Sequence, residues 1–273
     1  MTIHSPSSAA PLAAAPLAVN KEGLPFEIDE GIGTLANLGL LVLRTDQTIE
    51  DEFRFALPSS DVALYEARLY SDVEITPANL MKMSDEIPGT VGLLPDVEFD
   101  VIGFACTSGS LVIGEERITE RVHEVLPGVK VTNPVTAARA AMEALGARRI
   151  ALLTPYMPEI NHSLRLSLME LGIDIPVMGS FHEPDDNRVA RITSASIERA
   201  ILELGSSQEC DAVFVSCTSL RVARIVAEVE IRLGKPITSS NHALAWHMLR
   251  LAGYDRSMPD LGRLFALSDR RKP

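Results

Sequence analysis

The chain has 273 residues, of which 46% are hydrophobic and 5% aromatic, and its formal net charge at pH 7 is −12. This length suffices for one large domain or two of ordinary size. A core built from aliphatic rather than aromatic residues suits helices packed on parallel sheets. The acidic balance excludes nucleic acid and anionic membrane surfaces as expected partners.

Residues 1–30 are expected to form a flexible N-terminal arm. Residues 1–19 are rich in Ala, Pro and Ser and lack the basic and apolar regions of a secretory signal. No apolar run reaches the ~18 to 20 residues of a membrane-spanning helix. The three cysteines are widely spaced and do not form the pattern of a disulfide framework. We therefore predict a cytoplasmic protein.

Strands and helices are predicted to alternate along the rest of the chain. Apolar or alternating runs predict strands over 39–43, 62–69, 101–105, 129–132, 150–153, 175–180 and 212–215. Helical spacing, often ended by a glycine, predicts helices over 48–57, 78–87, 113–126, 135–145, 160–171, 197–204, 222–233 and 243–251. This alternation indicates an α/β fold with parallel sheets and helices on both faces.

The chain also contains an internal repeat. Segment 100–108 reads DVIGFACTS and segment 211–219 reads DAVFVSCTS, so that each has an acidic residue, five further residues and then Cys-Thr-Ser. Two more pairs of segments match at nearly the same offset, namely 40–46 with 150–156 and 131–137 with 237–243. A repeat this long indicates paired domains, because the periods of solenoids are shorter. We predict one lobe from 31–130 plus 236–267 and a second lobe from 131–235.

Cys106 and Cys217 occupy matched positions in this repeat, each just after a predicted strand and ahead of a predicted helix. Ligands bind beyond the C-terminal ends of parallel strands. A helix N-terminus there would bind a carboxylate and lower the pKa of a thiol. If the lobes face each other, one cysteine approaches the substrate from each side. That geometry suits moving a proton between the two faces of a carbon, or adding a thiolate to a double bond.

Other uses of these cysteines are less well supported. A single buried cysteine is most often structural, but two at matched positions with matched neighbours favour a functional pair. Cys210 lacks such neighbours and is expected to be structural or exposed. No Cys-x-x-Cys or ligand-type histidine spacing predicts a metal site, and no Gly-x-Gly-x-x-Gly follows the first strand. We expect neither a metal nor another cofactor.

The two Cys-Thr-Ser segments, the strand and loop over 39–48, and the LTPY of 153–156 resemble the aspartate/glutamate racemase superfamily. Within it they resemble the branch that holds maleate cis-trans isomerase, arylmalonate decarboxylase and the ectoine-utilisation protein EutA. The resemblance covers residues 31–267. It implies a cofactor-independent enzyme with two pseudo-symmetric parallel-sheet lobes and the active site between them.

The resemblance also implies roles for particular residues. Cys106 would be the nucleophile of a maleate isomerase, and Cys217 would supply or take a proton. Tyr156 and Asn187 would bind the substrate. Residues that would bind a carboxylate through N–H and hydroxyl groups are Thr107, Ser108, Thr218 and Ser219. The expected partner is a small-molecule carboxylate, and the expected assembly is a homo-oligomer.

One departure from the maleate isomerases bears on the substrate. Their Ser-Asn-Thr run is here DQT, which places Asp46 where an asparagine could donate hydrogen bonds. An ionised Asp46 would disfavour a second substrate carboxylate and favour an amine or amide. The alternative is that Asp46 only caps the following helix.

This run and the CTSG of 106–109 resemble the EutA subgroup, which implies a racemase or isomerase acting on an amino-acid derivative of ectoine breakdown. Maleate isomerisation and arylmalonate-type decarboxylation are the alternatives, although Cys106 argues against simple decarboxylation because arylmalonate decarboxylase has only the second cysteine. A cytoplasmic small-molecule binding or sensor protein is the non-enzymatic alternative. Thiol alkylation that abolishes turnover would favour an enzyme.

Overall fold

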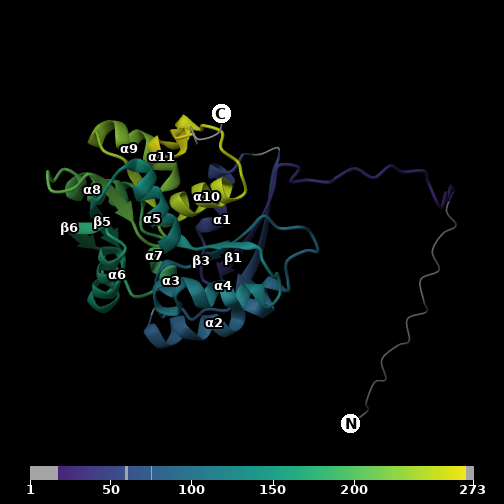
Figure 1. The fold of residues 1–273 in the computed structure, drawn as a ribbon, viewed down its shortest axis with the longest axis horizontal. Coiled ribbons are helices and arrows are strands. Elements are labelled where there is room, and N and C mark those ends of the chain that lie inside the picture. The colour runs from purple at the N-terminus through teal and green to yellow at the C-terminus, as the bar shows by residue number, and fades with distance from the viewer. Residues whose placement is uncertain (1–17, 59–60, 75, 269–273) are drawn as a thin grey trace, which may run out of the picture. The chain divides into compact units, whose positions relative to one another are not determined.

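The computed structural model describes residues 18–58, 61–74 and 76–268 (Figure 1). Contacts divide the chain into two units, Met1–Gly31 and Ile32–Pro273. In the described part of the first unit, residues 18–31 are exposed and form no helix or strand. The strands and helices discussed below all belong to the second unit.

The first sheet contains four parallel strands. They are β1 (Ala36–Leu43), β2 (Val62–Leu69), β3 (Val101–Ala105) and β4 (Lys130–Thr132). Their order across the sheet is β2-β1-β3-β4. Every residue of β3 is buried, as expected for a central parallel strand covered on both faces.

The second sheet repeats the plan of the first. Its strands are β5 (Arg149–Thr154), β6 (Asp174–Ser180), β7 (Ala212–Val215) and β8 (Ile237–Ser239). They are parallel and lie in the order β6-β5-β7-β8, which is the order of the first sheet shifted by four strands. The predicted α/β fold with two similar parallel sheets is confirmed.

The repeated aspartates explain how each cysteine-bearing strand is held. Asp100, ahead of β3, accepts a hydrogen bond at Oδ2 from the backbone N–H of Asn37 in β1, at 2.8 Å. Asp211, ahead of β7, accepts one at Oδ2 from the N–H of Arg149 in β5, at 3.1 Å. The backbone N–H groups of the two aspartates bond back to the carbonyls of the same partners. The acidic residue of the repeat therefore ties neighbouring strands together in both sheets.

Helices join and cover the strands. They are α1 (Ile49–Ala56), α2 (Pro77–Val91), α3 (Thr107–Ile113), α4 (Glu115–His123), α5 (Pro134–Leu145), α6 (Pro158–Glu170), α7 (Asp186–Val189), α8 (Ser194–Gly205), α9 (Val226–Leu233), α10 (Ser240–Leu251) and α11 (Arg263–Ala266), with the 3-10 turns η1 (Ala223–Ile225) and η2 (Pro259–Leu261). Helix α10 leaves β8 of the second sheet and packs on β3, α1 and α5, so the chain returns to the first sheet (Figure 1). The predicted lobe boundaries remain a prediction, while β4 pairs within the first sheet and β8 within the second.

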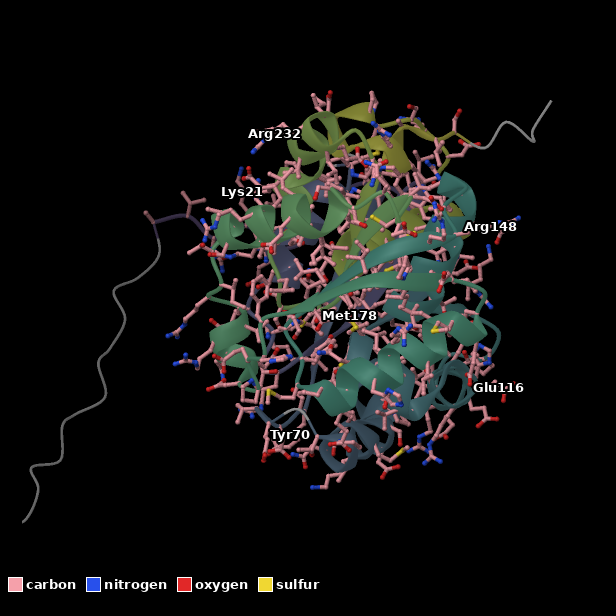
Figure 2. All side chains as sticks on the ribbon, turned by 90° about the vertical axis from the view of Figure 1, so that its left-hand side faces the viewer. Lys21, Tyr70, Glu116, Arg148, Met178 and Arg232 are labelled. Atoms are coloured by element: carbon pink, nitrogen blue, oxygen red, sulfur yellow. The ribbon has the colours of Figure 1, made fainter. Side chains whose placement is uncertain are left out.

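Strand β1 divides its side chains between two cores. Leu41 and Leu43 belong to a large cluster that also contains buried residues of the second sheet, such as Leu153. Leu38 and Leu40 point to the other face and pack in a cluster with α1, α5 and α10. Charged side chains instead extend from the surface, as Figure 2 shows for Glu116, Arg148 and Arg232.

Three predicted helices differ from those in the structure. The helix expected over 113–126 is replaced by α3 and α4, which meet at Gly114, whose φ of 88° favours glycine. Helix α2 continues past its predicted end at 87, through Pro88, to Val91. The helix expected from 222 begins as a 3-10 turn. Within the described residues, none of the helices is long and apolar enough to span a membrane.

Candidate active site

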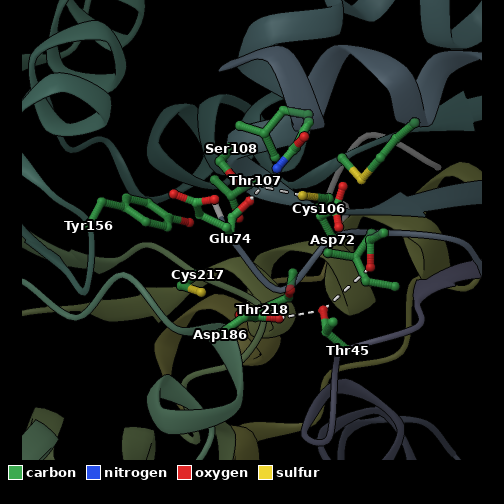
Figure 3. Close-up of a pocket in the computed structure, with 15 residues that line it drawn as sticks. Thr45, Asp72, Glu74, Cys106, Thr107, Ser108, Tyr156, Asp186, Cys217 and Thr218 are labelled. Carbon is green, nitrogen blue, oxygen red and sulfur yellow. Dashed lines mark hydrogen bonds between the residues drawn. The ribbon is translucent and has the colours of Figure 1, made fainter. Parts of the chain in front are cut away.

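A cavity lies at the C-terminal ends of strands from both sheets (Figure 3). Its lining includes Cys106 and Cys217, together with the predicted residues Thr107, Ser108, Tyr156 and Thr218. The space open to the centre of a water-sized sphere is about 20 Å³. Because one water needs roughly 10 to 15 Å³ on this measure, the side chains nearly fill the cavity. Glu74, in the loop after β2, pairs with Asp185, in the loop after β6, in a single antiparallel bridge. This bridge joins a loop of the first sheet to a loop of the second.

Cys106 follows β3 and caps the N-terminus of α3. It is a free, buried thiol whose Sγ accepts a hydrogen bond from the N–H of Gly109 at 3.2 Å. The hydroxyl of Ser108 lies 3.6 Å from the same sulfur. Burial raises the pKa of the Cys106 thiol to about 12, against these two hydrogen bonds, which lower it. The expectation that a helix N-terminus would lower this pKa is therefore wrong, because removal from water outweighs the local donors.

Cys217 follows β7 at the equivalent position, but in a different backbone conformation. Its φ is 154°, a value that L-residues rarely adopt, and such conformations cost about 1–3 kcal/mol. No helix starts directly after it, and the next helical turn, η1, begins at Ala223, close to the predicted helix start at 222. Burial and the charge of Asp186 raise the pKa of the Cys217 thiol well above its usual value, whereas the N–H of Ser219 and the hydroxyl of Tyr156 lower it.

Ser240 links the two cysteine motifs. Its Oγ accepts a hydrogen bond from the hydroxyl of Thr107 at 2.7 Å and another from the backbone N–H of Cys217 at 3.0 Å. Ser240 is fully buried at the start of α10. It thus holds Cys217 in its unusual conformation and fixes one motif relative to the other. Ser240 lies in the repeated segment 237–243, but no role was predicted for it.

Tyr156 follows β5 and enters the cavity beside Cys217 (Figure 3). The ring is 2% exposed, and its pKa is raised well above 10 by burial and by the neighbouring thiols. The hydroxyl therefore stays protonated, and it lies near enough to the sulfur of Cys217 to lower the pKa of that thiol. The predicted contact of Tyr156 with the site is present in the structure.

Asp186 lines the cavity, whereas the residue predicted to bind the substrate was its neighbour Asn187. Its Oδ2 accepts a hydrogen bond from the hydroxyl of Thr45 at 2.6 Å, and its Oδ1 accepts one from Ser219 at 2.7 Å. The predicted Asn187 is not part of the cavity lining, and its Oδ1 accepts a hydrogen bond from Gln47 instead. Ser219 is not part of the cavity lining, and its role in the site is the hydrogen bond that it donates to Asp186.

Asp46 accepts hydrogen bonds at the start of helix α1, whose N-cap is Thr48, and it is not part of the cavity lining. Its Oδ1 accepts hydrogen bonds from the N–H groups of Thr48 at 2.7 Å and Ile49 at 2.9 Å. Among the described residues, Oδ2 has no hydrogen-bond partner of good geometry, although the hydroxyl of Thr218 is near enough to lower its pKa. Burial raises the pKa of Asp46 to about 6. These contacts are those of the helix-capping alternative.

We expect Asp46→Asn to leave dicarboxylate binding within about twofold of wild type, because asparagine caps about as well as aspartate and the residue is outside the lining. Calorimetric titration of maleate into both proteins measures this. A gain of about tenfold or more, which is about 1.4 kcal/mol, would instead mean that the carboxylate reaches the substrate.

Glu52 holds the loop that carries Cys217. This buried residue of α1 accepts hydrogen bonds at Oε1 from the N–H groups of Val222 and Ala223, both at 2.8 Å. Its Oε2 accepts one from Asn241 Nδ2 at 3.2 Å, and that amide also donates to the carbonyl of Thr218 at 2.7 Å. Burial raises the pKa of Glu52 to about 7.

We expect Glu52→Gln to remove a pH-dependent part of the stability. The folded-state pKa of about 7 exceeds the ordinary 4.5, so the folded protein holds this proton more tightly than the unfolded chain does. The resulting stabilisation is complete below about pH 4.5 and is lost as the pH rises through about 7. Relative to the variant, wild type should lose up to about 3 kcal/mol of unfolding free energy across this window. Urea unfolding measures it, with the surface variant Glu116→Gln as control, and parallel pH curves for wild type and Glu52→Gln would contradict it.

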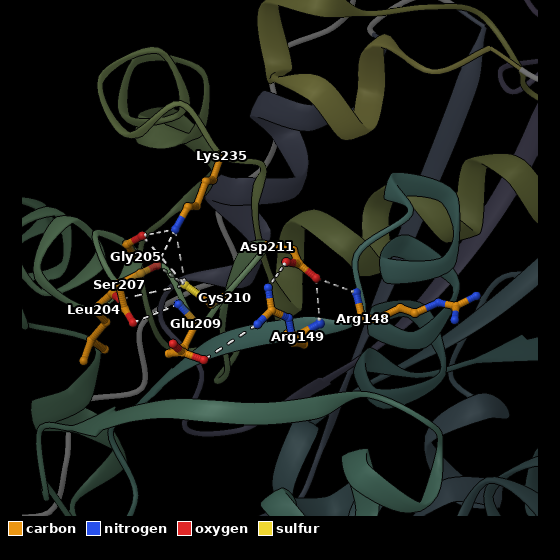
Figure 4. A network of polar contacts seen from close by, with 9 residues as sticks. All are labelled: Arg148, Arg149, Leu204, Gly205, Ser207, Glu209, Cys210, Asp211 and Lys235. Atoms are coloured by element: carbon orange, nitrogen blue, oxygen red, sulfur yellow. Dashed lines mark hydrogen bonds and ion pairs between the residues drawn. The ribbon is translucent and has the colours of Figure 1, made fainter.

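Cys210 lies outside the cavity, among backbone carbonyls (Figure 4). Its buried Sγ is 3.4 Å from the carbonyl oxygen of Ser207 and 3.7 Å from that of Gly205. Lys235 Nζ donates to both of these carbonyls and lies 3.7 Å from the sulfur. The environment of Cys210 is that of a structural cysteine.

Two similar parallel sheets with paired thiols in one cavity define a class of α/β proteins. A family model described as arylmalonate decarboxylase matches residues 73–265. The chain belongs to the arylmalonate decarboxylase family.

Three relatives show the range of this similarity. Arylmalonate decarboxylase from Bordetella bronchiseptica is 32% identical over 140 residues, which are 50% of this chain and 58% of that protein. Maleate isomerase from Pseudomonas putida is 24% identical over 245 residues, which are 85% of this chain and 98% of that protein. The structure of a Nocardia farcinica maleate cis-trans isomerase mutant with a covalently bound succinylcysteine intermediate has a TM-score of 0.77 at 24% identity and covers 85% of this chain and 98% of that chain. This last likeness is one of fold, and the particular closeness to EutA stays a prediction.

Proposed function

We propose that this protein is a cofactor-independent isomerase that uses Cys106 and Cys217 on a small carboxylate, namely an amino-acid derivative of ectoine breakdown. The observation that carries the proposal is that two free thiols from equivalent strand ends of a repeated fold line one nearly filled cavity. A structural role for both would not require them to share a cavity with the hydroxyl of Tyr156.

The reaction we favour is racemisation. One cysteine, as the thiolate, takes the proton from the carbon beside the substrate carboxylate, and the other thiol gives its proton to the opposite face. The first sulfur ends as a thiol and the second as a thiolate, so atoms and charge balance and the two roles are exchanged. Tyr156 and the N–H of Ser219 stabilise the Cys217 thiolate, and the N–H of Gly109 stabilises that of Cys106.

We assign the substrate carboxylate to the hydroxyls of Ser108 and Thr218, which line the cavity from the two motifs. Of the four residues predicted for this role, the Thr107 hydroxyl donates to Ser240 and the Ser219 hydroxyl donates to Asp186. These two residues therefore act by holding the cavity walls. Asp46 and Asn187 are assigned indirect roles because they lie outside the cavity lining and are hydrogen-bonded to Thr48 and Gln47.

Maleate isomerisation is the second candidate, favoured by the similarity to maleate isomerase over 85% of the chain. The relative with a succinylcysteine intermediate supports a covalent route, in which Cys106 would add to the double bond and be expelled after rotation. A homo-oligomeric state and a cytoplasmic location belong to the proposal as expectations from the sequence.

Proton NMR in D2O distinguishes the candidates. The enzyme, dialysed against a chelator, is incubated with amino-acid derivatives and with maleate. Racemisation replaces the hydrogen on the carbon beside the carboxylate by deuterium without net conversion, whereas cis-trans isomerisation yields fumarate. The double variant Cys106→Ala/Cys217→Ala is the control. Deuterium exchange that persists in this variant, or no reaction with any compound in wild type, would overturn the proposal.

A further inference from the structure

The cavity is acidic. Three carboxylates, those of Asp72, Glu74 and Asp186, line it, and the lining contains no Lys, Arg or His among the described residues. Asp186 is 5% exposed, whereas Asp72 and Glu74 lie at the exposed rim. A substrate with two carboxylates would bring further negative charge to a cavity without a cation.

Asp186 is held in place with acceptor capacity to spare. Thr45 and Ser219 each donate one hydrogen bond to it, at 2.6 and 2.7 Å, one to each oxygen. A carboxylate accepts at about four lone-pair sites, so about half of its capacity is left. A buried carboxylate without a cationic partner is costly even when it is hydrogen-bonded. The position of Asp186 in the lining, with both thiols, places this capacity beside the proposed reaction centre (Figure 3).

Resting on the function proposed above, we propose that Asp186 binds a protonated amine of the substrate, and that Asp72 and Glu74 attract this group at the rim. The substrate class is then a small molecule with one carboxylate and one ammonium group rather than a dicarboxylate. The hydroxyls of Ser108 and Thr218 line the same cavity and would turn from their neighbours Cys106 and Asp46 to the carboxylate end.

This assignment couples substrate choice to thiol activation. The charge of Asp186 adds to burial in raising the pKa of both Cys217 and Cys106. An ammonium group beside Asp186 offsets that charge and increases the thiolate fraction. A second carboxylate would have the opposite effect.

Calorimetric titration of matched ligands tests the subsite. The ligands are 4-aminobutyrate, pentanoate and glutarate, which share a carboxylate and a chain but end in an ammonium, a methyl and a second carboxylate. The protein is the double variant Cys106→Ala/Cys217→Ala, which performs no thiol chemistry. We expect 4-aminobutyrate to bind at least about tenfold more tightly than either of the others. Equal or weaker binding of 4-aminobutyrate, or no binding of it, would overturn the inference.

A charge-removing variant supplies the second arm. Adding Asp186→Asn should abolish the preference for 4-aminobutyrate, and the fold should persist because the hydroxyls of Thr45 and Ser219 can donate or accept. In the protein with intact cysteines, Asp186→Asn should also speed alkylation of both thiols by iodoacetamide at constant pH. The control Asp96→Asn removes an exposed charge outside the cavity and should change neither measurement. A preference that survives Asp186→Asn would assign the amine elsewhere.

Loss of the ammonium subsite and loss of racemase activity would give different experimental results. Because the binding arm uses a protein without reactive cysteines, its outcome does not depend on racemisation. Ammonium selectivity without deuterium exchange in wild type would leave a cation-selective binding protein, whereas exchange without selectivity would leave the isomerase and remove the subsite.

Discussion

Replacing either Cys106 or Cys217 by alanine should lower turnover by at least about 1,000-fold, because a reaction that needs an acid on one face and a base on the other has no substitute for either sulfur. Both side chains are buried in the same cavity. Alanine removes only the sulfur, so the fold should persist, at a cost of about 1–3 kcal/mol in stability. Deuterium exchange by NMR measures the activity, and circular dichroism with urea unfolding checks the fold.

Cys210→Ser is the matched control for loss of a thiol. Its sulfur faces the carbonyls of Gly205 and Ser207, to which a serine hydroxyl can also donate. Activity should stay within about twofold of wild type, since this residue lies outside the cavity. An inactive Cys210→Ser together with an active Cys106→Ala would contradict the assignment of the reaction to Cys106 and Cys217. A Cys106→Ala variant that decarboxylates an arylmalonate would favour the decarboxylase alternative.

The sequence predicted the fold where local patterns decide it. The apolar runs of the central strands are long enough to define β3 and β7 at their observed ends. The pattern failed where a single backbone angle decides, as at Gly114, whose positive φ separates two helices. It also missed the four-residue helix α7, which is too short to show a period.

The site was predictable only in the part that the repeat displays. Cys106 and Cys217 could be found because duplication placed matched neighbours around them. Asp186, Ser240 and Glu52 could not, because their contacts join segments up to 189 residues apart in the chain. The prediction of Asn187 was one residue from Asp186, and at the start of a helix one position decides which side chain enters the cavity.

The pKa values of the thiols show why local motifs mislead about reactivity. A cysteine at a helix N-terminus is expected to ionise easily, and Cys106 does cap α3. Its complete burial nevertheless dominates, so the pKa is raised to about 12. How deeply a side chain is buried depends on both sheets together, which no local window of sequence contains.

Tyr156→Phe should lower kcat/KM at neutral pH by about ten- to a hundredfold, the range that corresponds to losing a hydrogen bond of about 1.5–3 kcal/mol to a charged group. The hydroxyl lies near enough to Cys217 to lower the pKa of that thiol, and its own pKa, raised well above 10, keeps it a donor throughout the working pH range. Without it the pKa of Cys217 rises further. The ascending limb of the pH–rate profile should therefore move to higher pH by about one unit or more, and activity should recover partly in alkaline buffer. Tyr65→Phe is the matched control, because that ring packs edge to face on Phe99 outside the cavity. A profile that falls in height without moving would mean that Tyr156 only shapes the cavity and does not stabilise the thiolate.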